Sequence, residues 1–248
     1  MTSSYHTGWV LVAGAGGALG HAVATHFANA KRRVIALDRH FDDENGLINS
    51  DIVTATVDAS HDVELRQTLD RMVGDGRIAL LVNAIGRIWN EPCLSIKGGK
   101  FVSHSIESWR DVIEANLTVP FIVANEVAAR MARKRGGVIV NFSSIASGGN
   151  AGQAAYSAAK AAIEGWTRVM AAELGPLGVR VNAIAPGFID VKTTRAAVSE
   201  TRLKDYIART PAGRLGQVAD LTGAIEFLEA NSFVTGTVLR LDGGLRLS

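Results

Sequence analysis

The chain has 248 residues, 47% of them hydrophobic, and a formal net charge of +2. This length suits one α/β domain with a large buried core, and the charge gives no general attraction to nucleic acid or to a membrane surface. One cysteine, Cys93, excludes an intramolecular disulfide, no apolar stretch reaches the ~18 residues of a spanning helix, and the first residues lack the regions of a signal peptide. We therefore expect a cytoplasmic protein that binds neither nucleic acid nor membrane.

Strand-like and helix-like segments alternate along the whole chain. We expect strands near residues 9–13, 33–38, 52–57, 78–83, 137–143, 179–184 and 237–241. This alternation predicts an α/β fold, a Rossmann-like, doubly wound parallel sheet of about seven strands in three αβα layers, with residues 1–248 as one domain. The link between the second and third strands, residues 40–50, is too short for a full helix with a turn on each side.

The first expected strand runs into a glycine-rich turn and then a helix that starts near Ala18. Glycines let the backbone turn sharply and approach a pyrophosphate, and the helix offers free N–H groups and the positive end of its dipole. A dinucleotide would thus be held by the residues of this turn, Gly14, Gly16, Gly17, Ala18, Leu19 and Gly20.

The second strand ends in Asp38, about 20 residues beyond the turn. A carboxylate there accepts hydrogen bonds from the ribose hydroxyls of the adenosine half and repels a 2′-phosphate. Arg39 follows directly and would offset part of that repulsion. The sequence therefore favours NAD as the cofactor over NADP.

Polar and small residues also follow the third and fourth strands. Asp58, next to Ala59, is placed to meet an adenine amino group, and the small residues around Asn83, Ala84 and Gly86 let a cofactor lie against the sheet. Ligands of open parallel sheets bind at the carboxyl ends of the strands, where these residues gather.

Tyr156 and Lys160 are four residues apart in an alanine-rich helix, so they share one face. A free tyrosine has a pKa near ~10 and is a poor acid or base at neutral pH. A neighbouring ammonium favours the phenolate, so we expect Lys160 to lower the pKa of Tyr156, helped by an oxidised nicotinamide nearby.

Several motifs together resemble those of the short-chain dehydrogenase/reductase family, from about Val10 to Gly244. They are GAGGALG, Asp38, NAIG, the Asn of EANL, FSS followed by YSAAK, VNAIAPG and FVTGTVLRLDGG. The resemblance implies a catalytic group in which Tyr156 is the general acid/base, Lys160 lowers its pKa and holds the nicotinamide ribose, and a serine binds the substrate oxygen. It also implies that Asn116 anchors a water leading to Lys160. No metal is expected.

Two serines compete for the substrate-binding role. The family usually uses the second serine of such a pair, which is Ser144, whereas the commonest spacing to Tyr156 points to Ser143. We favour Ser144, because strand register constrains a side chain's direction more than loop length does.

Residues after the sixth strand are expected to meet the nicotinamide and to shape the substrate pocket. Val191 stands where the family commonly has a threonine, so Thr193, Thr194 or backbone groups would take that role. We expect a substrate loop over residues 187–214 and cofactor contacts from Pro186, Gly187, Ile189, Val191 and Thr193.

The segment between the fourth strand and Asn116 is longer than is common in the family. Short-chain 3-hydroxyacyl-CoA dehydrogenases resemble it in having an insertion here, and Lys97 and Lys100 are candidates to face phosphates. Trp89 is a better candidate for substrate contact than Cys93.

The leading hypothesis is an NAD-dependent oxidoreductase that interconverts a secondary alcohol and a ketone, with 3-hydroxyacyl thioesters as the first substrate candidate and a polar or cyclic alcohol as the second. The alternatives are an NADPH-dependent carbonyl or 3-oxoacyl-acyl-carrier-protein reductase and a non-catalytic dinucleotide sensor. Apolar surface on the long helix from Ser105 and on the helix after Tyr156 predicts a homo-oligomer, a tetramer or a dimer.

Overall fold

The computed structural model describes residues 8–41 and 49–247, so most of the short link between the second and third strands lies outside the described residues. A seven-stranded sheet has the order β3-β2-β1-β4-β7-β8-β9, with every neighbouring pair parallel. Its strands are β1 (Trp9–Ala13), β2 (Val34–Asp38), β3 (Ile52–Thr56), β4 (Ile78–Asn83), β7 (Gly137–Phe142), β8 (Val179–Pro186) and β9 (Val238–Leu241). The predicted doubly wound sheet is confirmed.

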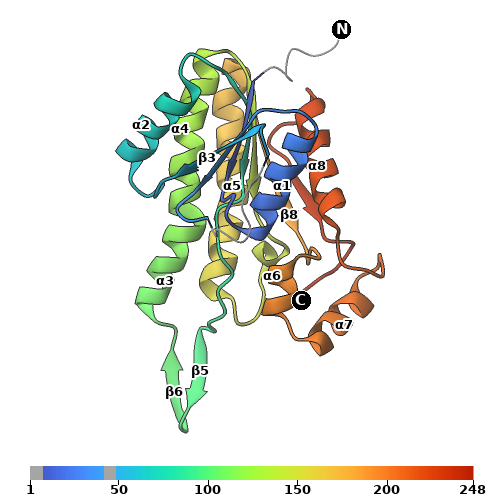
Figure 1. Ribbon diagram of the computed structural model, residues 1–248. Coiled ribbons are helices and arrows are strands. Elements are labelled where there is room, and N and C mark those ends of the chain that lie inside the picture. The colour runs from blue at the N-terminus through green and yellow to red at the C-terminus, as the bar shows by residue number, and fades with distance from the viewer. Residues whose placement is uncertain (1–7, 42–48, 248) are drawn as a thin grey trace.

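Helices cover both faces of this sheet (Figure 1). One face packs against α1 (Ala18–Asn29) and α8 (Val218–Ala230), and the other against α2 (Asp62–Val73), α4 (Val119–Arg133) and α5 (Ala154–Leu174). Within β1, Val12 packs on the face covered by α1 and α8, and Leu11 packs on the opposite face. Successive side chains of a strand point to opposite faces of the sheet. Both faces are therefore buried, which explains why the central strands are continuous apolar runs.

The chain reverses its direction of winding between β1 and β4. From β1 it moves outward to β2 and β3, and then returns to β4 on the other side of β1. The loops after β1 and β4 consequently leave the sheet in opposite directions and open a crevice at the carboxyl ends of the strands. The predicted cofactor residues of both loops lie at this crevice.

The helix before β7 is continuous from Ile106 to Arg133. It consists of α3 (Ile106–Ile113), a π-helical turn (Glu114–Thr118) and α4. By length and composition it could cross a membrane, with a mean hydropathy of 1.3 in its most apolar 18-residue window, so the expectation that no apolar stretch is long enough was wrong. Val123 and Val127 are fully buried against the sheet, as in the core helix of a globular protein.

A β-hairpin that the sequence analysis did not predict projects from the body of the molecule (Figure 1). Its strands are β5 (Leu94–Lys97) and β6 (Lys100–Ser103), antiparallel and joined by Gly98 and Gly99 with φ of +57° and +75°. Lys97 and Lys100 are paired across the strands at its tip, away from the crevice, so the idea that they face bound phosphates is not supported.

The predicted substrate loop contains two helices, α6 (Lys192–Ala197) and α7 (Glu200–Arg209). Phe188 and Tyr206 stack with ring centroids 4.1 Å apart, which ties α7 to the segment that follows β8. Asp190 and Arg195 form an ion pair of 2.6 Å across the start of α6. The loop is thus an ordered pair of short helices at the carboxyl end of β8.

Candidate active site

Tyr156 and Lys160 lie on the first two turns of α5, which packs along β8. Alanines surround both side chains in the sequence and let the helix approach the sheet closely. Lys160 is 3% exposed and Tyr156 is 9% exposed, and the Lys160 Nζ lies 5.7 Å from the centroid of the Tyr156 ring. The predicted pair therefore shares one buried helix face.

The pKa of the Tyr156 hydroxyl is raised rather than lowered. Burial raises it, and a hydrogen bond with Ser144 opposes that effect. Burial also lowers the pKa of Lys160 to about 8, and its Nζ donates a hydrogen bond of 2.9 Å to the carbonyl oxygen of Phe142. The expectation was that Lys160, helped by an oxidised nicotinamide, lowers the pKa of Tyr156. In the chain by itself the pKa of Tyr156 is raised instead, because burial disfavours the charged phenolate.

The two serines at the end of β7 point in different directions. The Ser143 hydroxyl lies 3.1 Å from the carbonyl oxygen of Lys160 and 2.8 Å from Glu164 Oε1, so its single proton is donated to one of these two acceptors, and Ser143 is 4% exposed. Ser144 instead lies beside the Tyr156 hydroxyl, and its Oγ accepts a hydrogen bond of 3.1 Å from the Ala146 N–H. The structure therefore brings Ser144, and not Ser143, next to Tyr156.

Asn116 lies in the π-helical turn and is fully buried. Its Nδ2 donates to the Val112 carbonyl oxygen at 3.0 Å, and its Oδ1 accepts from the Arg87 N–H at 2.9 Å. A π turn is a local widening that is frequent at functional sites, and here it directs Asn116 to the loop after β4. Sequence periodicity gave no sign of this turn.

Gly86 is the point where Asn116 and Lys160 meet. Its φ is +146°, and a Cβ at this position would lie 2.6 Å from Asn116 Oδ1 and 3.1 Å from Lys160 Nζ. Any larger residue would push these two groups aside, so Gly86 is required by both its backbone conformation and its neighbours. Asn116 and Lys160, which were predicted separately along the chain, thus meet at Gly86.

The glycine-rich turn has the geometry of an anion cradle. Gly14 has φ +83°, and its Cα packs against the Ala84 carbonyl group, which joins the ends of β1 and β4. Gly20 is buried against Gly14. Gly17 precedes α1 in an extended conformation with no side chain capping the helix, so the N–H groups of the first turn, including those of Ala18 and Leu19, lack intrahelical partners.

Asp38 lies against this turn at the end of β2. One carboxylate oxygen accepts a hydrogen bond of 2.9 Å from the Gly16 N–H, and the other accepts from the Arg39 N–H at 2.7 Å and the His40 N–H at 3.3 Å. Backbone groups therefore fix the position of the carboxylate. The Arg39 side chain is exposed.

The predicted cofactor residues at the ends of β3 and β4 differ in their exposure to solvent. Asp58 is exposed, and its pKa is lowered chiefly by the Ser60 backbone N–H and also by the Ser60 hydroxyl, next to buried Ala59. Asn83 is buried, and its Nδ2 donates to the Pro120 carbonyl oxygen at 2.7 Å. The Asn83 side chain therefore links the sheet to α4 and is turned away from the crevice, whereas Ala84 and Gly86 remain partly accessible.

The predicted residues after β8 are close to β9. The Gly187 N–H donates to the Leu241 carbonyl oxygen at 2.8 Å, and Pro186 pairs with Leu241 in the sheet. Ile189 is 2% exposed, Val191 precedes α6 and is half-buried, and Thr193 is exposed. Ile189 is thus mainly a packing residue, while Val191 and Thr193 lie at the start of the substrate loop.

Together, these features fit a nicotinamide dinucleotide. The glycine turn and the start of α1 suit a pyrophosphate, Asp38 suits a ribose diol, and Lys160 with Tyr156 lies at the far end of the same crevice. Among the described residues, no group of three His, Cys, Asp or Glu side chains is placed to hold a metal ion.

Comparison with known proteins gives matches over almost the whole chain. A family model described as enoyl-(acyl carrier protein) reductase matches residues 14–246. The 3-oxoacyl-[acyl-carrier-protein] reductase of Salmonella typhimurium is 32% identical over 245 residues, which cover 95% of this chain and 96% of that protein.

Two solved structures are also similar. A putative gluconate dehydrogenase from Agrobacterium tumefaciens has a TM-score of 0.84 and 29% identity, with 97% of each chain covered. A gluconate 5-dehydrogenase from Burkholderia cenocepacia, in complex with NADP and tartrate, has a TM-score of 0.82 and 29% identity, covering 96% of this chain and 94% of that one.

Proposed function

Because the chain belongs to the short-chain dehydrogenase/reductase family and is an oxidoreductase of hydroxyl and keto groups, we propose that Tyr156 is its general acid/base in the interconversion of a secondary alcohol and a ketone. The observation that carries this proposal is a chain of contacts. Tyr156 lies beside Ser144 and near Lys160, Lys160 and Asn116 meet at Gly86, and Ala84, two residues before Gly86, packs on the glycine turn. A bound nicotinamide supplies or accepts the hydride.

In this scheme each side chain has a separate task. Ser144 and the Tyr156 hydroxyl bind the substrate oxygen, so that donors are already in place where charge develops. Tyr156 then gives or takes the proton. Its raised pKa favours the protonated form, which suits donation to a ketone.

Lys160 connects Tyr156 to the proton supply. With a pKa of about 8, its ammonium is mostly charged at pH 7 and still exchanges protons readily. Asn116 Oδ1 lies on the other side of the Gly86 position and provides an acceptor for a relay to solvent. These roles give a reason for burying two polar side chains, Lys160 and Asn116, beside Gly86.

We further propose NAD as the cofactor. Asp38 is held by three backbone N–H groups beside the turn, where it accepts ribose hydroxyls and opposes a 2′-phosphate. The NADP complex of the gluconate 5-dehydrogenase favours the other cofactor. Dissociation constants of the two reduced cofactors would decide, and tighter NADPH binding would contradict the proposal.

A homo-oligomer, a tetramer or a dimer, is the assembly that the surface favours. Trp109 on α3, Phe121 on α4 and Val169 on α5 are 37%, 44% and 52% exposed, and the Phe121 ring lies 5.4 Å from that of Trp166. Large apolar side chains grouped on neighbouring helices are typical of interfaces. Sedimentation should give a mass at least twice 26.2 kDa, and a monomer would contradict this. A cytoplasmic location without membrane attachment stays a prediction.

Two substrate classes have specific support. The 3-oxoacyl-acyl-carrier-protein reductase described above is similar over 95% of this chain, and the two gluconate dehydrogenases have similar folds. We propose β-hydroxyacyl thioesters and polar hydroxy acids as the panel to test first, by following the absorbance of the reduced nicotinamide.

Substitution of Tyr156 by Phe tests the mechanism. It removes one hydroxyl from a buried ring, so the fold should persist while kcat falls by at least about 10²-fold, the usual contribution of a positioned acid. Tyr206→Phe, which also removes one tyrosine hydroxyl and keeps the stack on Phe188, is the matched control for folding, and both variants should keep the unfolding midpoint of the wild type. Near-normal turnover of Tyr156→Phe would end the proposal.

A further inference from the structure

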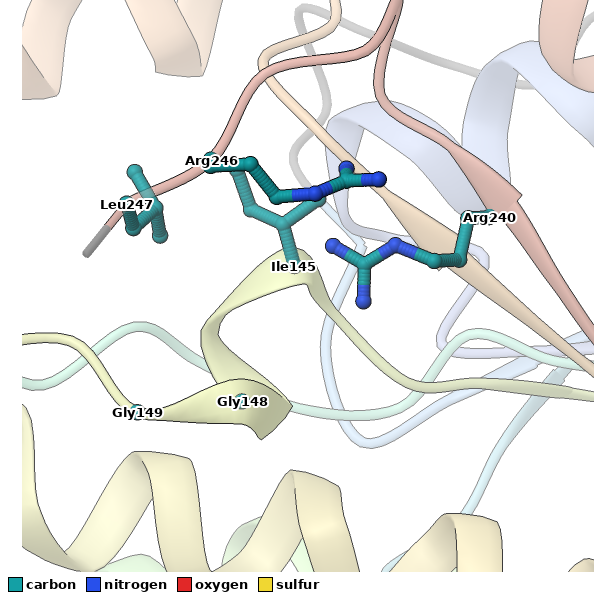
Figure 2. Close-up of a pocket in the computed structure, with 6 residues that line it drawn as sticks. All are labelled: Ile145, Gly148, Gly149, Arg240, Arg246 and Leu247. Atoms are coloured by element: carbon teal, nitrogen blue, oxygen red, sulfur yellow. The ribbon is translucent and has the colours of Figure 1, made fainter.

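A cavity of 220 Å³ lies between the C-terminal segment and the loop that follows Ser144. It is lined by Ile145, Gly148, Gly149, Arg240, Arg246 and Leu247. Figure 2 shows the Arg240 and Arg246 guanidinium groups pointing toward one another above the turn that contains Ile145. The sequence analysis did not single out either arginine.

Among the described residues, those at the cavity carry more positive than negative charge. Asp242 Oδ2 accepts from Arg240 Nε at 2.9 Å and from Arg246 Nη1 at 3.3 Å, and its Oδ1 accepts from the Gly244 N–H at 2.9 Å. One carboxylate, whose side chain is 6% exposed, thus serves two guanidinium groups. Asp242 fixes both side chains in position but neutralises only one of them.

Both arginines keep donors available. Within the described part of the chain, the terminal nitrogens of Arg240 and the Nε and Nη2 of Arg246 make no hydrogen bond, and the two side chains are 40% and 64% exposed. Guanidinium groups bind carboxylates and phosphates through paired N–H donors. The free donors and the excess charge suit an oxyanion.

The cavity borders the catalytic group on two sides. Ile145 follows Ser144 directly, and Leu247 packs against the buried cluster that contains Ala146 and Tyr156. Its volume is below the roughly 300 Å³ at which small-molecule sites begin, so it suits one end of a ligand rather than a whole one. A ligand end held here would lie beside the loop that begins at Ser144.

We propose that Arg240 and Arg246 bind an anionic group, a carboxylate or a phosphate, that the substrate carries away from its reacting carbon. This inference rests on the proposed function and names the substrate class as anionic alcohols and ketones. Asp242 is a positioning residue that holds the two arginines toward the cavity.

Binding of small anions tests the site without any need for turnover. Tartrate and inorganic phosphate would be titrated by calorimetry into the protein saturated with NAD, for the wild type and for Arg246→Gln. The variant should weaken binding by about tenfold, as expected for one charge-assisted pair, and the tighter of the two anions identifies the group. Arg66→Gln is the matched control, since Arg66 is half-exposed on α2 and forms an ion pair of 2.8 Å with Glu126 of α4, outside the cavity. Equal affinities of the wild type and Arg246→Gln, or no binding of either anion, would overturn the proposal.

Kinetics then test whether the site serves the substrate. Gluconate would be compared with glucitol, and acetoacetyl-CoA with the neutral thioester acetoacetyl-N-acetylcysteamine. In any pair that the enzyme turns over, Arg246→Gln should raise the KM of the anionic substrate about tenfold. The KM of the neutral substrate should change by no more than about twofold. An equal change in both members would overturn the assignment to the substrate. If anions bind but no member of either pair reacts, the proposed function fails for these substrates while the anion site stands.

Discussion

Lys160 is 3% exposed and lies among Tyr156, Asn116 and Gly86, whereas Leu94, Ile96 and Phe101 on one face of the β5–β6 hairpin are 54%, 68% and 74% exposed. The first group comes from three separate elements that are held by the core, and each member has neighbours that leave no room for change. The hairpin is made of ten consecutive residues and contacts little besides itself. The core therefore fixes the positions of the residues proposed for chemistry, whereas few contacts within the chain constrain the side chains of the hairpin.

The largest effect is expected in the buried site, where substitution of Ser144 should lower kcat far more than substitution of its neighbour Ser143. Ser144→Ala should lower kcat about 10²- to 10³-fold, because it removes a donor aimed at the substrate oxygen. Ser143→Ala should change kcat only a few-fold, since its hydroxyl serves Lys160 O and Glu164. Steady-state kinetics of both variants would decide. A greater loss in Ser143→Ala would reverse the assignment.

The pH dependence of stability reports the burial of Lys160. Its folded pKa of about 8 lies below its ordinary value of 10.5, so between these values the unfolded chain binds more protons than the folded one. Stability therefore rises with pH across this window. The free energy of unfolding, measured in urea, should increase by about 2 kcal/mol from pH 7.5 to 9.5 relative to Lys160→Met. An equal pH slope in both proteins would show that Lys160 is not desolvated.

A smaller effect is expected at the other end of the crevice. Asp38→Asn removes the charge that opposes a 2′-phosphate, so the ratio of the NADPH to the NADH dissociation constant should fall about tenfold, the scale of one charged contact. Asp58→Asn, at the next strand end, should leave this ratio unchanged. Fluorescence titration of both reduced cofactors measures it. An unchanged ratio in Asp38→Asn would remove the basis for choosing NAD.

The smallest effect should come from the hairpin. Ile96→Ser and Phe101→Ser replace exposed side chains, so kcat should stay within about twofold and the unfolding midpoint should barely move. Thermal unfolding and steady-state kinetics check both. A marked loss of thermal stability would mean that this face is buried against another molecule in solution.

Much of the fold could be predicted because its signals are local. Each central strand is a buried apolar run, and the predicted ends of β1 and β4 agree with the structure residue for residue. Tyr156 and Lys160 could be paired because helical spacing alone puts them on one face. The hairpin was missed although Gly98-Gly99 between two short strands is a hairpin signal, because the segment was interpreted as an insertion without structure of its own.

Other features of the site depend on contacts between distant segments. The pKa of Tyr156 is set by burial, which the sequence does not display, and the Lys160 Nζ contact is to a backbone carbonyl of β7. The Asn83 side chain donates to the Pro120 carbonyl oxygen, a contact with a distant segment that its position at a strand end does not reveal. Arg240 and Arg246 are held locally by Asp242, but only the fold places them opposite Ile145, Gly148 and Gly149 in one cavity.

Hydrogen bonds outside β5 and β6 close the base of the hairpin. The His104 N–H donates to the Cys93 carbonyl oxygen at 3.0 Å, the Ser105 N–H donates to Glu91 Oε1 at 2.7 Å, and Gln153 donates to Asn90 Oδ1 at 2.8 Å. Residues 94–103 could therefore be excised and the ends rejoined by a short turn without moving Asn116 or α5. The same junction makes this position a natural insertion point, at which foreign peptides could be grafted onto a working enzyme.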